Sequence, residues 1–107
     1  MVYVGNILYD DKLKCAGNKL VIFGAGVYGR KVLRYLELND LKKNVVCFCD
    51  SNEKINKTEI SGISVYQTKE VIKRNPEADY LISGKHAKEM YHILRKEGIK
   101  KIHILIS

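Results

Sequence analysis

The sequence predicts an α/β domain of three layers, in which helices cover a mostly parallel sheet of about five strands. From Lys19 onward, short apolar runs alternate with amphipathic stretches, as in consecutive βαβ units. Most of these runs are continuously apolar, which is typical of strands that are covered on both faces. With a glycine-rich turn after the first run, the pattern is that of a Rossmann-like domain. The runs are Leu20–Phe23, Val45–Cys49, Ile63–Tyr66, Tyr80–Ile82 and Ile102–Ile106.

The segment between the first two runs predicts a helix that packs on the sheet. Its apolar positions recur at helical spacing, and charged residues occupy the other side. The inward positions are Gly29, Val32, Leu33 and Leu36, and the outward positions are Arg30, Lys31, Arg34 and Glu37. The polar stretch from residue 50 to 62 predicts a loop rather than a full helix.

Two further helices are predicted in the second half of the chain. Thr68 can cap a short helix that ends at about Arg74, because the following Asn-Pro pair cannot continue it. The last helix, about residues 85–97, ends at Gly98, a residue type suited to the position after a helix. We expect Ile99 to fold back on the apolar stripe of that helix.

Length and pattern predict a single domain over residues 19–107, preceded by an extension over residues 1–18. Val2–Val4 suggest a short strand, and Ile7–Cys15 could form a frayed helix. A chain of 107 residues can close one hydrophobic core, but it is short for a nucleotide-binding half plus a catalytic half.

The composition is that of a soluble globular protein, with 46% hydrophobic and 29% charged residues. No apolar run approaches the roughly 20 residues of a membrane helix. The first residues lack the pattern of a signal peptide. We therefore expect a cytoplasmic protein that does not bind membranes.

The charge distribution and the cysteine spacing argue against a nucleic-acid surface and a metal site. The net charge of +7 would suit nucleic acid, but lysines are spread through every segment, so we expect a solvated surface instead. Cys47 and Cys49 should point to the same face of a strand. A metal site with Cys15 as third ligand is not expected, because Cys-x-Cys lacks the paired pattern of zinc sites.

The strongest motif is the glycine loop Gly24-Ala25-Gly26-Val27-Tyr28-Gly29, which follows the first strand and opens the first helix. Gly24 should make the tight turn, Gly26 should let a phosphate approach the backbone, and Gly29 should let the helix lie close to the strand. Free N–H groups at the helix end would meet the anion. The alternative is that the glycines only permit a compact crossing and that the site is empty.

Asp50 ends the second apolar run, 21 residues after Gly29, where a carboxylate can accept hydrogen bonds from ribose hydroxyls. Such a carboxylate disfavours a 2′-phosphate. The alternative is that Asp50, Ser51 and Asn52 are ordinary turn residues.

A second candidate segment, Ser83-Gly84-Lys85-His86, follows the fourth strand, and the carboxyl ends of parallel strands rim the ligand crevice. Lys85 or His86 could reach a phosphate, a sugar or a carboxylate. The alternative is a helix cap at Ser83 with solvated neighbours. Arg30 could also touch a phosphate or be a surface residue. Tyr28 could stack on a ligand or fill the place of a pyrophosphate.

No catalytic constellation is predicted. His92 falls inside the last helix and His103 inside the last strand, and neither has a nucleophile or a carboxylate at a spacing that suggests a dyad. We expect both histidines to be structural or exposed. No tyrosine has the Tyr-x-x-x-Lys spacing of short-chain dehydrogenases.

Three segments together resemble the small Rossmann-like domains of bacterial surface-polysaccharide enzymes. They are residues 21–30, residues 47–52 and residues 60–65. The chain resembles the N-terminal domain of sugar acetyltransferases and the CoA-binding-like domain of nucleotide-sugar dehydratases from about Lys19 to its end. The resemblance implies a module that holds a nucleotide sugar or an NAD-like dinucleotide while another domain performs the chemistry. The β-helix and the larger Rossmann domain of those enzymes are absent from this sequence.

The leading hypothesis is therefore a non-catalytic nucleotide-binding module linked to bacterial polysaccharide biosynthesis. Its ligand would be NAD or a nucleotide sugar, and its partner a catalytic domain in a longer chain or a separate protein. A small NAD(P)-dependent oxidoreductase is the alternative, with Lys85 or His86 as its acid and a homo-oligomer to complete its site. A ligand-free interaction or oligomerisation domain is the third hypothesis.

Overall fold

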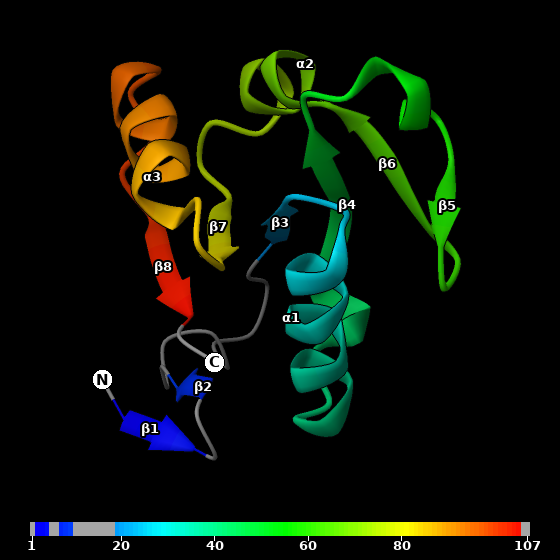
Figure 1. Ribbon diagram of the computed structural model, residues 1–107, viewed down its shortest axis with the longest axis vertical. Helices are drawn as coiled ribbons and strands as arrows, with labels where there is room; N and C mark the ends of the chain where they lie inside the picture. The colour runs from blue at the N-terminus through cyan, green and yellow to red at the C-terminus, as the bar shows by residue number, and fades with distance from the viewer. Residues whose placement is uncertain (1, 5–6, 10–18, 106–107) are drawn as a thin grey trace.

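The fold is described from a computed structural model, over residues 2–4, 7–9 and 19–105. Within these residues the main sheet has the strand order β5-β6-β4-β3-β7-β8, and only β5 runs antiparallel to its neighbour (Figure 1). The mostly parallel α/β fold is confirmed. The strands are β3 (Leu20–Phe23), β4 (Val45–Asp50), β5 (Glu59–Ile60), β6 (Ile63–Gln67), β7 (Asp79–Ser83) and β8 (Ile102–Leu105).

Helices cover both faces of the sheet, so the domain has the three predicted layers. The helices are α1 (Val27–Leu38), α2 (Thr68–Arg74) and α3 (Ala87–Lys96). In Figure 1, α1 and α3 lie on opposite sides of strands β3 and β7. Successive side chains of β3 point to opposite faces of the sheet, and each face has its own hydrophobic core. Leu20 and Ile22 pack in the core with α1, whereas Val21 and Phe23 pack in the core with α2 and α3.

Helix α1 packs as its periodicity predicts. Gly29, Val32, Leu33 and Leu36 are buried, and so is Tyr35, which the pattern did not include. Arg30, Lys31 and Arg34 are exposed. The helix ends at Leu38, where the Asn39 side chain donates a hydrogen bond to the Tyr35 carbonyl at 2.9 Å.

The polar connection between β4 and β6 contains no α-helix, as predicted. It forms the 3₁₀ turn η3 (Glu53–Ile55) and then the short strand β5, which pairs with β6. The two linking residues, Ser61 and Gly62, both have positive φ angles, 53° and 83°. This is the geometry of a tight two-residue hairpin turn. The sequence analysis missed β5 because it is only two residues long and lies among polar residues.

The starts of α2 and α3 correct two predicted caps. Gln67 occupies the cap position of α2, and Thr68 is already helical. The Thr68 hydroxyl instead lies 3.3 Å from that of Ser51. Ser83 is buried at the end of β7 and does not cap α3, which begins after His86.

The end of α3 is as predicted. Gly98 has a φ of +85°, and its N–H donates to the Arg95 carbonyl at 3.0 Å. The next N–H, of Ile99, donates to the Leu94 carbonyl at 3.0 Å, which completes a Schellman motif. Ile99 is 1% exposed and packs in the cluster that contains Leu94.

Two short strands near the start, β1 (Val2–Val4) and β2 (Ile7–Tyr9), form an antiparallel pair. The strand prediction for Val2–Val4 is confirmed, and the helix prediction is wrong for Ile7–Tyr9. The rest of that predicted helix, residues 10–15, lies outside the described residues. The split into an extension and a domain at residue 19 stays a prediction.

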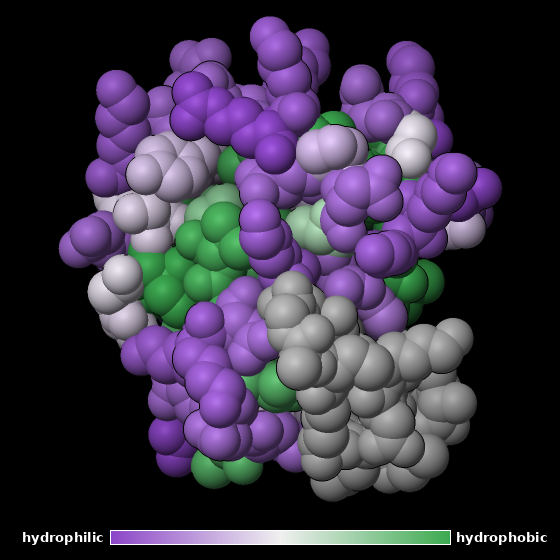
Figure 2. Space-filling model, turned by 180° about the vertical axis from the view of Figure 1, so that it is seen from behind, coloured by the Kyte–Doolittle hydropathy of each residue, from purple (hydrophilic) through white to green (hydrophobic). Residues whose placement is uncertain are grey.

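The described surface is largely polar. Figure 2 shows hydrophilic side chains over most of one face, with a single larger apolar patch among them. In the part of the chain that the structure describes, no helix is long and apolar enough to cross a membrane.

Candidate functional site

A cleft of about 190 Å³ lies at the carboxyl edge of the sheet, where β3 and β7 end side by side. Strand β4, the next strand along the chain, lies on one side of β3 in the sheet, and β7 lies on the other side. The turns that leave β3 and β7 therefore lead to helices on opposite faces of the sheet, which leaves a crevice between them.

The cleft brings together eight of the twelve predicted site residues, which line it with Phe23, Val27 and Met90: Gly24, Gly26, Tyr28, Gly29, Asp50, Ser83, Lys85 and His86. The other four predicted residues, Arg30, Ser51, Asn52 and Gly84, are not part of the lining. Arg30 is exposed on α1, Ser51 faces Thr68, and Asn52 caps η3 through a hydrogen bond from the Lys54 N–H.

Two of the three loop glycines are required by the fold itself. Gly24 has a φ of +98°, and its N–H donates to the Cys49 carbonyl at 2.7 Å, which fixes the turn after β3. A Cβ at Gly29 would lie 1.9 Å from the Gly24 carbonyl oxygen. Helix α1 can therefore lie against the turn only because residue 29 has no side chain.

Gly26 differs from both. It occupies the cap position of α1 in extended backbone, with a φ of −85° and a ψ of −154°, and a Cβ built there would meet nothing within 4 Å. The fold therefore does not require a glycine at this position. Its missing side chain leaves the first turn of α1 open toward the cleft.

Asp50 ties the end of β4 to the glycine loop. One carboxylate oxygen accepts the Ala25 N–H at 2.9 Å, and the other accepts the Asn52 N–H at 2.8 Å. The turn role that the sequence left open as an alternative is thus present. Each carboxylate oxygen can accept a second hydrogen bond, so a ribose contact remains compatible with these bonds.

The amino ends of α1 and α3 both meet the cleft. Within the described residues, the His86 side chain makes no capping bond to α3, and Gly26 has no side chain with which to cap α1. The first turn of α1 holds no acidic residue, whereas that of α3 holds Glu89. The first N–H groups of a helix have no partner inside the helix and carry partial positive charge. Lys85 and His86 add basic groups to the lining. The amino end of α1 is therefore suited to an anion, while the Asp50 carboxylate lines another part of the cleft.

Tyr28 reaches across from the glycine loop to the β7–α3 turn. A Cβ at Gly84 would lie 2.6 Å from Cδ2 of Tyr28, so the ring rests directly on Gly84. The Lys31 ammonium lies 5.5 Å from the centre of the same ring. The sequence marked Tyr28 as a ligand contact, but the contact with Gly84 depends on the fold of two distant turns.

The cysteines pack as small hydrophobic residues. Cys47 and Cys49 are both buried in the core on the α2 and α3 side, which confirms that they share a face. Burial raises the pKa of the Cys47 thiol to about 11 and that of Cys49 further. The described residues contain no group of three potential metal ligands, and Cys15 lies outside them.

The histidines are exposed or structural, as predicted, but one of them has a carboxylate partner that the sequence analysis missed. His92 is exposed on α3. His103 on β8 is buried, and its Nε2 lies 2.9 Å from an Asp79 carboxylate oxygen on β7. The two residues are 24 positions apart, so only the pairing of parallel strands brings them together.

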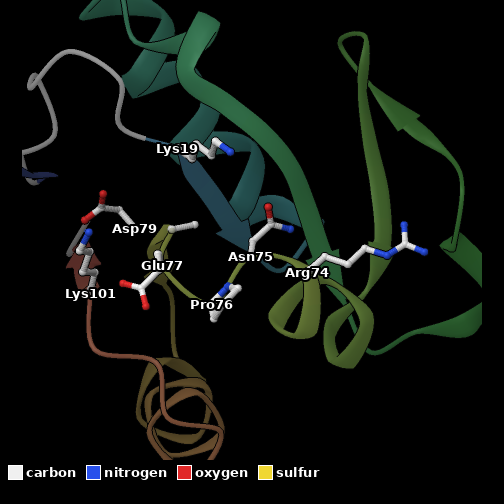
Figure 3. A pocket seen from close by; sticks show the side chains of 8 residues that line it. Lys19, Arg74, Asn75, Pro76, Glu77, Asp79 and Lys101 are labelled. Atoms are coloured by element: carbon white, nitrogen blue, oxygen red, sulfur yellow. The ribbon is translucent and has the colours of Figure 1, made fainter.

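A second, larger cavity of about 370 Å³ lies at the opposite edge of the sheet, where β7 begins. Figure 3 shows Glu77, Asp79 and Lys101 at one end of it and Arg74 at the other. Acidic Glu77 and Asp79 stand beside basic residues in this lining, and Arg74 is already paired with Glu70 at 2.9 Å. The cavity thus has no uniform charge that would favour an anion.

Residues 16–105 match the family model described as C2185-like, N-terminal. The chain belongs to this family. None of the curated proteins matches it. The match covers the glycine loop, Asp50 and the β7–α3 turn, so the whole cleft lies within the family's domain.

Solved structures show the same fold. RSP, a Rex-family repressor, is 22% identical with a TM-score of 0.64 over 87% of this chain and 46% of its own. UDP-D-quinovosamine 4-dehydrogenase from Vibrio fischeri is 23% identical with a TM-score of 0.59 over 83% of this chain and 76% of its own. The chain thus spans less than half of the repressor. RSP has also been solved with β-NADH, and with β-NAD+ and operator DNA. At 22–23% sequence identity, these similarities establish a Rossmann-like fold and nothing about the ligand.

Proposed function

We propose that this chain is a non-catalytic module that binds a nucleotide, with the diphosphate on the β3–α1 turn and the ribose at Asp50. NAD-like dinucleotides and nucleotide sugars both contain this nucleoside-diphosphate group. The domain that holds it would span residues 19–107.

Gly26 carries this proposal. An empty, purely structural loop needs Gly24 for its positive φ and Gly29 for the close approach of α1. Neither a positive φ nor a close approach calls for glycine at residue 26, because a Cβ there would meet no atom within 4 Å. A ligand phosphate that approaches the backbone at this point is a reason for glycine that the fold does not supply.

The comparisons support a nucleotide ligand without fixing its class. One structural neighbour was solved with NADH, and another is named for its action on a UDP sugar. The link to polysaccharide biosynthesis and to sugar acetyltransferases rests on the sequence resemblance alone. A catalytic partner, in a longer chain or as a separate protein, is part of the proposal.

The oxidoreductase alternative has less support from the cleft. Among the described lining residues, proton transfer to or from a substrate would fall to Lys85 and His86. The His86 ring already faces Glu89, at 3.7 Å, and its side chain is 60% exposed. A hydride-transfer site would need a better-positioned acid.

Nucleic acid is not part of the proposal. The operator DNA in the repressor complex belongs to a protein of which this chain matches 42%. The basic residues of this chain are spread over all segments rather than gathered in one stripe. Mobility shift with a duplex at physiological salt tests this, and a specific complex would contradict it.

A thermal-shift panel tests the proposed function. ADP, UDP, NAD, NADH, NADP, CoA and UDP-N-acetylglucosamine are each added to the purified protein. A ligand at about 100 times its Kd raises the unfolding free energy by roughly 2.7 kcal/mol, which moves the midpoint by on the order of 10 °C. If no nucleotide shifts the midpoint at millimolar concentration, the loop is a scaffold and the interaction-domain alternative gains.

A further inference from the structure

The cleft is small for a dinucleotide. Its volume of about 190 Å³ is below the roughly 300–1,000 Å³ of sites that enclose a whole ligand of drug size. The glycine loop bounds it on one side and the β7–α3 turn on the other. Tyr28 and Met90 both reach into the space between these turns, and the Tyr28 ring makes the closer approach to the opposite backbone.

The Tyr28 ring closes the crevice by direct contact. A Cβ at Gly84 would lie 2.6 Å from Cδ2 and 2.7 Å from Cγ of Tyr28, so no atom fits between the ring and the opposite backbone. Gly84 has a φ of +96°, which favours glycine on conformational grounds as well. The ring therefore bridges two turns that belong to opposite faces of the sheet.

The ring is held by surface contacts rather than by burial. Tyr28 is 40% exposed. The Lys31 ammonium, 5.5 Å from the ring centre, is within the range of a cation–π interaction. A contact of this kind keeps the ring in place and still lets it be displaced at moderate cost.

We propose that Tyr28 determines which class of nucleotide this site accepts: nucleoside diphosphates bind in preference to ligands that continue beyond the second phosphate. The inference rests on the proposed function, with the phosphates at the amino end of α1. A sugar or second nucleoside attached to them would run toward Ser83 and Lys85, and the Tyr28 ring crosses that path. Such a ligand binds only to molecules in which the ring has moved, so its apparent affinity falls by the fraction of molecules that are open.

Titration calorimetry on matched ligand pairs tests the inference. ADP is compared with NAD, and UDP with UDP-N-acetylglucosamine, so that each pair shares its nucleoside diphosphate. We expect the wild type to bind the shorter member of at least one pair about tenfold more tightly, and Tyr28→Ala to remove that preference by raising the affinity for the longer member. Tyr28→Phe keeps the ring and should keep the preference.

Tyr66→Ala is the matched control, because Tyr66 is also 40% exposed but lies on β6, outside the cleft lining. It should leave both affinities unchanged. A wild-type ratio near one, or an unchanged ratio in Tyr28→Ala, overturns the role of Tyr28 while nucleotide binding stands. Loss of both ligands in Tyr28→Ala makes the ring a stacking contact and also overturns it. If no variant binds any nucleotide, the proposed function fails and this inference with it.

Discussion

Alanine at two glycines of the same loop should affect two different properties: folding stability at Gly29 and nucleotide affinity at Gly26. In Gly29→Ala the new Cβ would lie 1.9 Å from the Gly24 oxygen and 2.9 Å from its carbonyl carbon. Both are backbone atoms, so the helix or the turn must shift. Overpacking of this kind costs about 3 kcal/mol, which lowers the unfolding midpoint by on the order of 10–20 °C.

Gly26→Ala should be nearly neutral for stability. A Cβ there meets nothing within 4 Å, and the φ of −85° suits alanine. The reduced entropy of the unfolded chain stabilises by about 0.4–1 kcal/mol, and the poorer helix cap costs a similar amount. The methyl group would, however, stand where the phosphate approaches the backbone, so the Kd for a nucleotide should rise about tenfold to 100-fold, since each lost hydrogen bond to a charged group is worth roughly 1.5–3 kcal/mol.

Both variants are measured by thermal unfolding and by titration calorimetry with the ligand that the panel identifies. Wild-type affinity in Gly26→Ala would refute the placement of the phosphate, and the loop would then be a structural crossing alone. An unchanged midpoint in Gly29→Ala would refute the close packing of α1 on the turn. Because the two substitutions add the same methyl group, the comparison separates the structural from the ligand-binding demand on the loop.

Three further predictions concern Asp50, the buried pair and the buried thiols. Asp50→Asn should reduce the preference for ADP over 2′-deoxy-ADP in calorimetry, and an unchanged preference would argue against a ribose contact. It should also lower the unfolding free energy by about 1–2 kcal/mol, because one of the two backbone N–H groups that donate to Asp50 loses its acceptor. Asp79→Ala should lower the unfolding free energy in urea by about 2 kcal/mol, because it removes a buried carboxylate that lies within hydrogen-bond distance of His103. It should leave nucleotide affinity unchanged, and a change in affinity would contradict the assignment of this pair to the other edge. Burial raises the pKa of Cys47 to about 11, against an ordinary 9.0, so the folded thiol stays protonated at a pH where the unfolded one ionises. The unfolding free energy should therefore fall as the pH rises from about 9 through 11. A Cys47→Ala variant should lose less stability over this range, and a pH profile identical to that of the wild type would contradict this cause.

The parts of the molecule that the sequence predicted well are those with local signals. Strand β3 is a continuous apolar run that is buried along its whole length, and α1 shows a clear helical period. The spacing of Gly24, Gly26 and Gly29 is also a local signal, and it predicted the turn after β3 and the start of α1. Asp50 could be brought to that turn because parallel strands end at the same edge of a sheet.

The parts that could not be predicted depend on contacts between distant segments. The Tyr28 ring meets Gly84 only because β3 and β7 are neighbours, and nothing in the sequence fixes that order. The pairing of His103 with Asp79 follows from the register of β8 on β7 in the same way. Strand β5 is different, because the Ser61-Gly62 turn was visible and could have indicated a hairpin.

In the nucleotide-binding module that we propose, the position of the cleft gives the ligand a way to affect both outer layers of the domain. The two turns that line it lead to α1 on one face of the sheet and α3 on the other. Within the described residues, the Tyr28 ring against Gly84 and the Met90 side chain beside Gly24 join the two sides of the crevice. A nucleotide that contacts both turns would replace or reinforce those contacts and restrain both helix ends at once. Because the restraint would extend to both outer layers, a partner that packs on either layer could respond to the bound ligand.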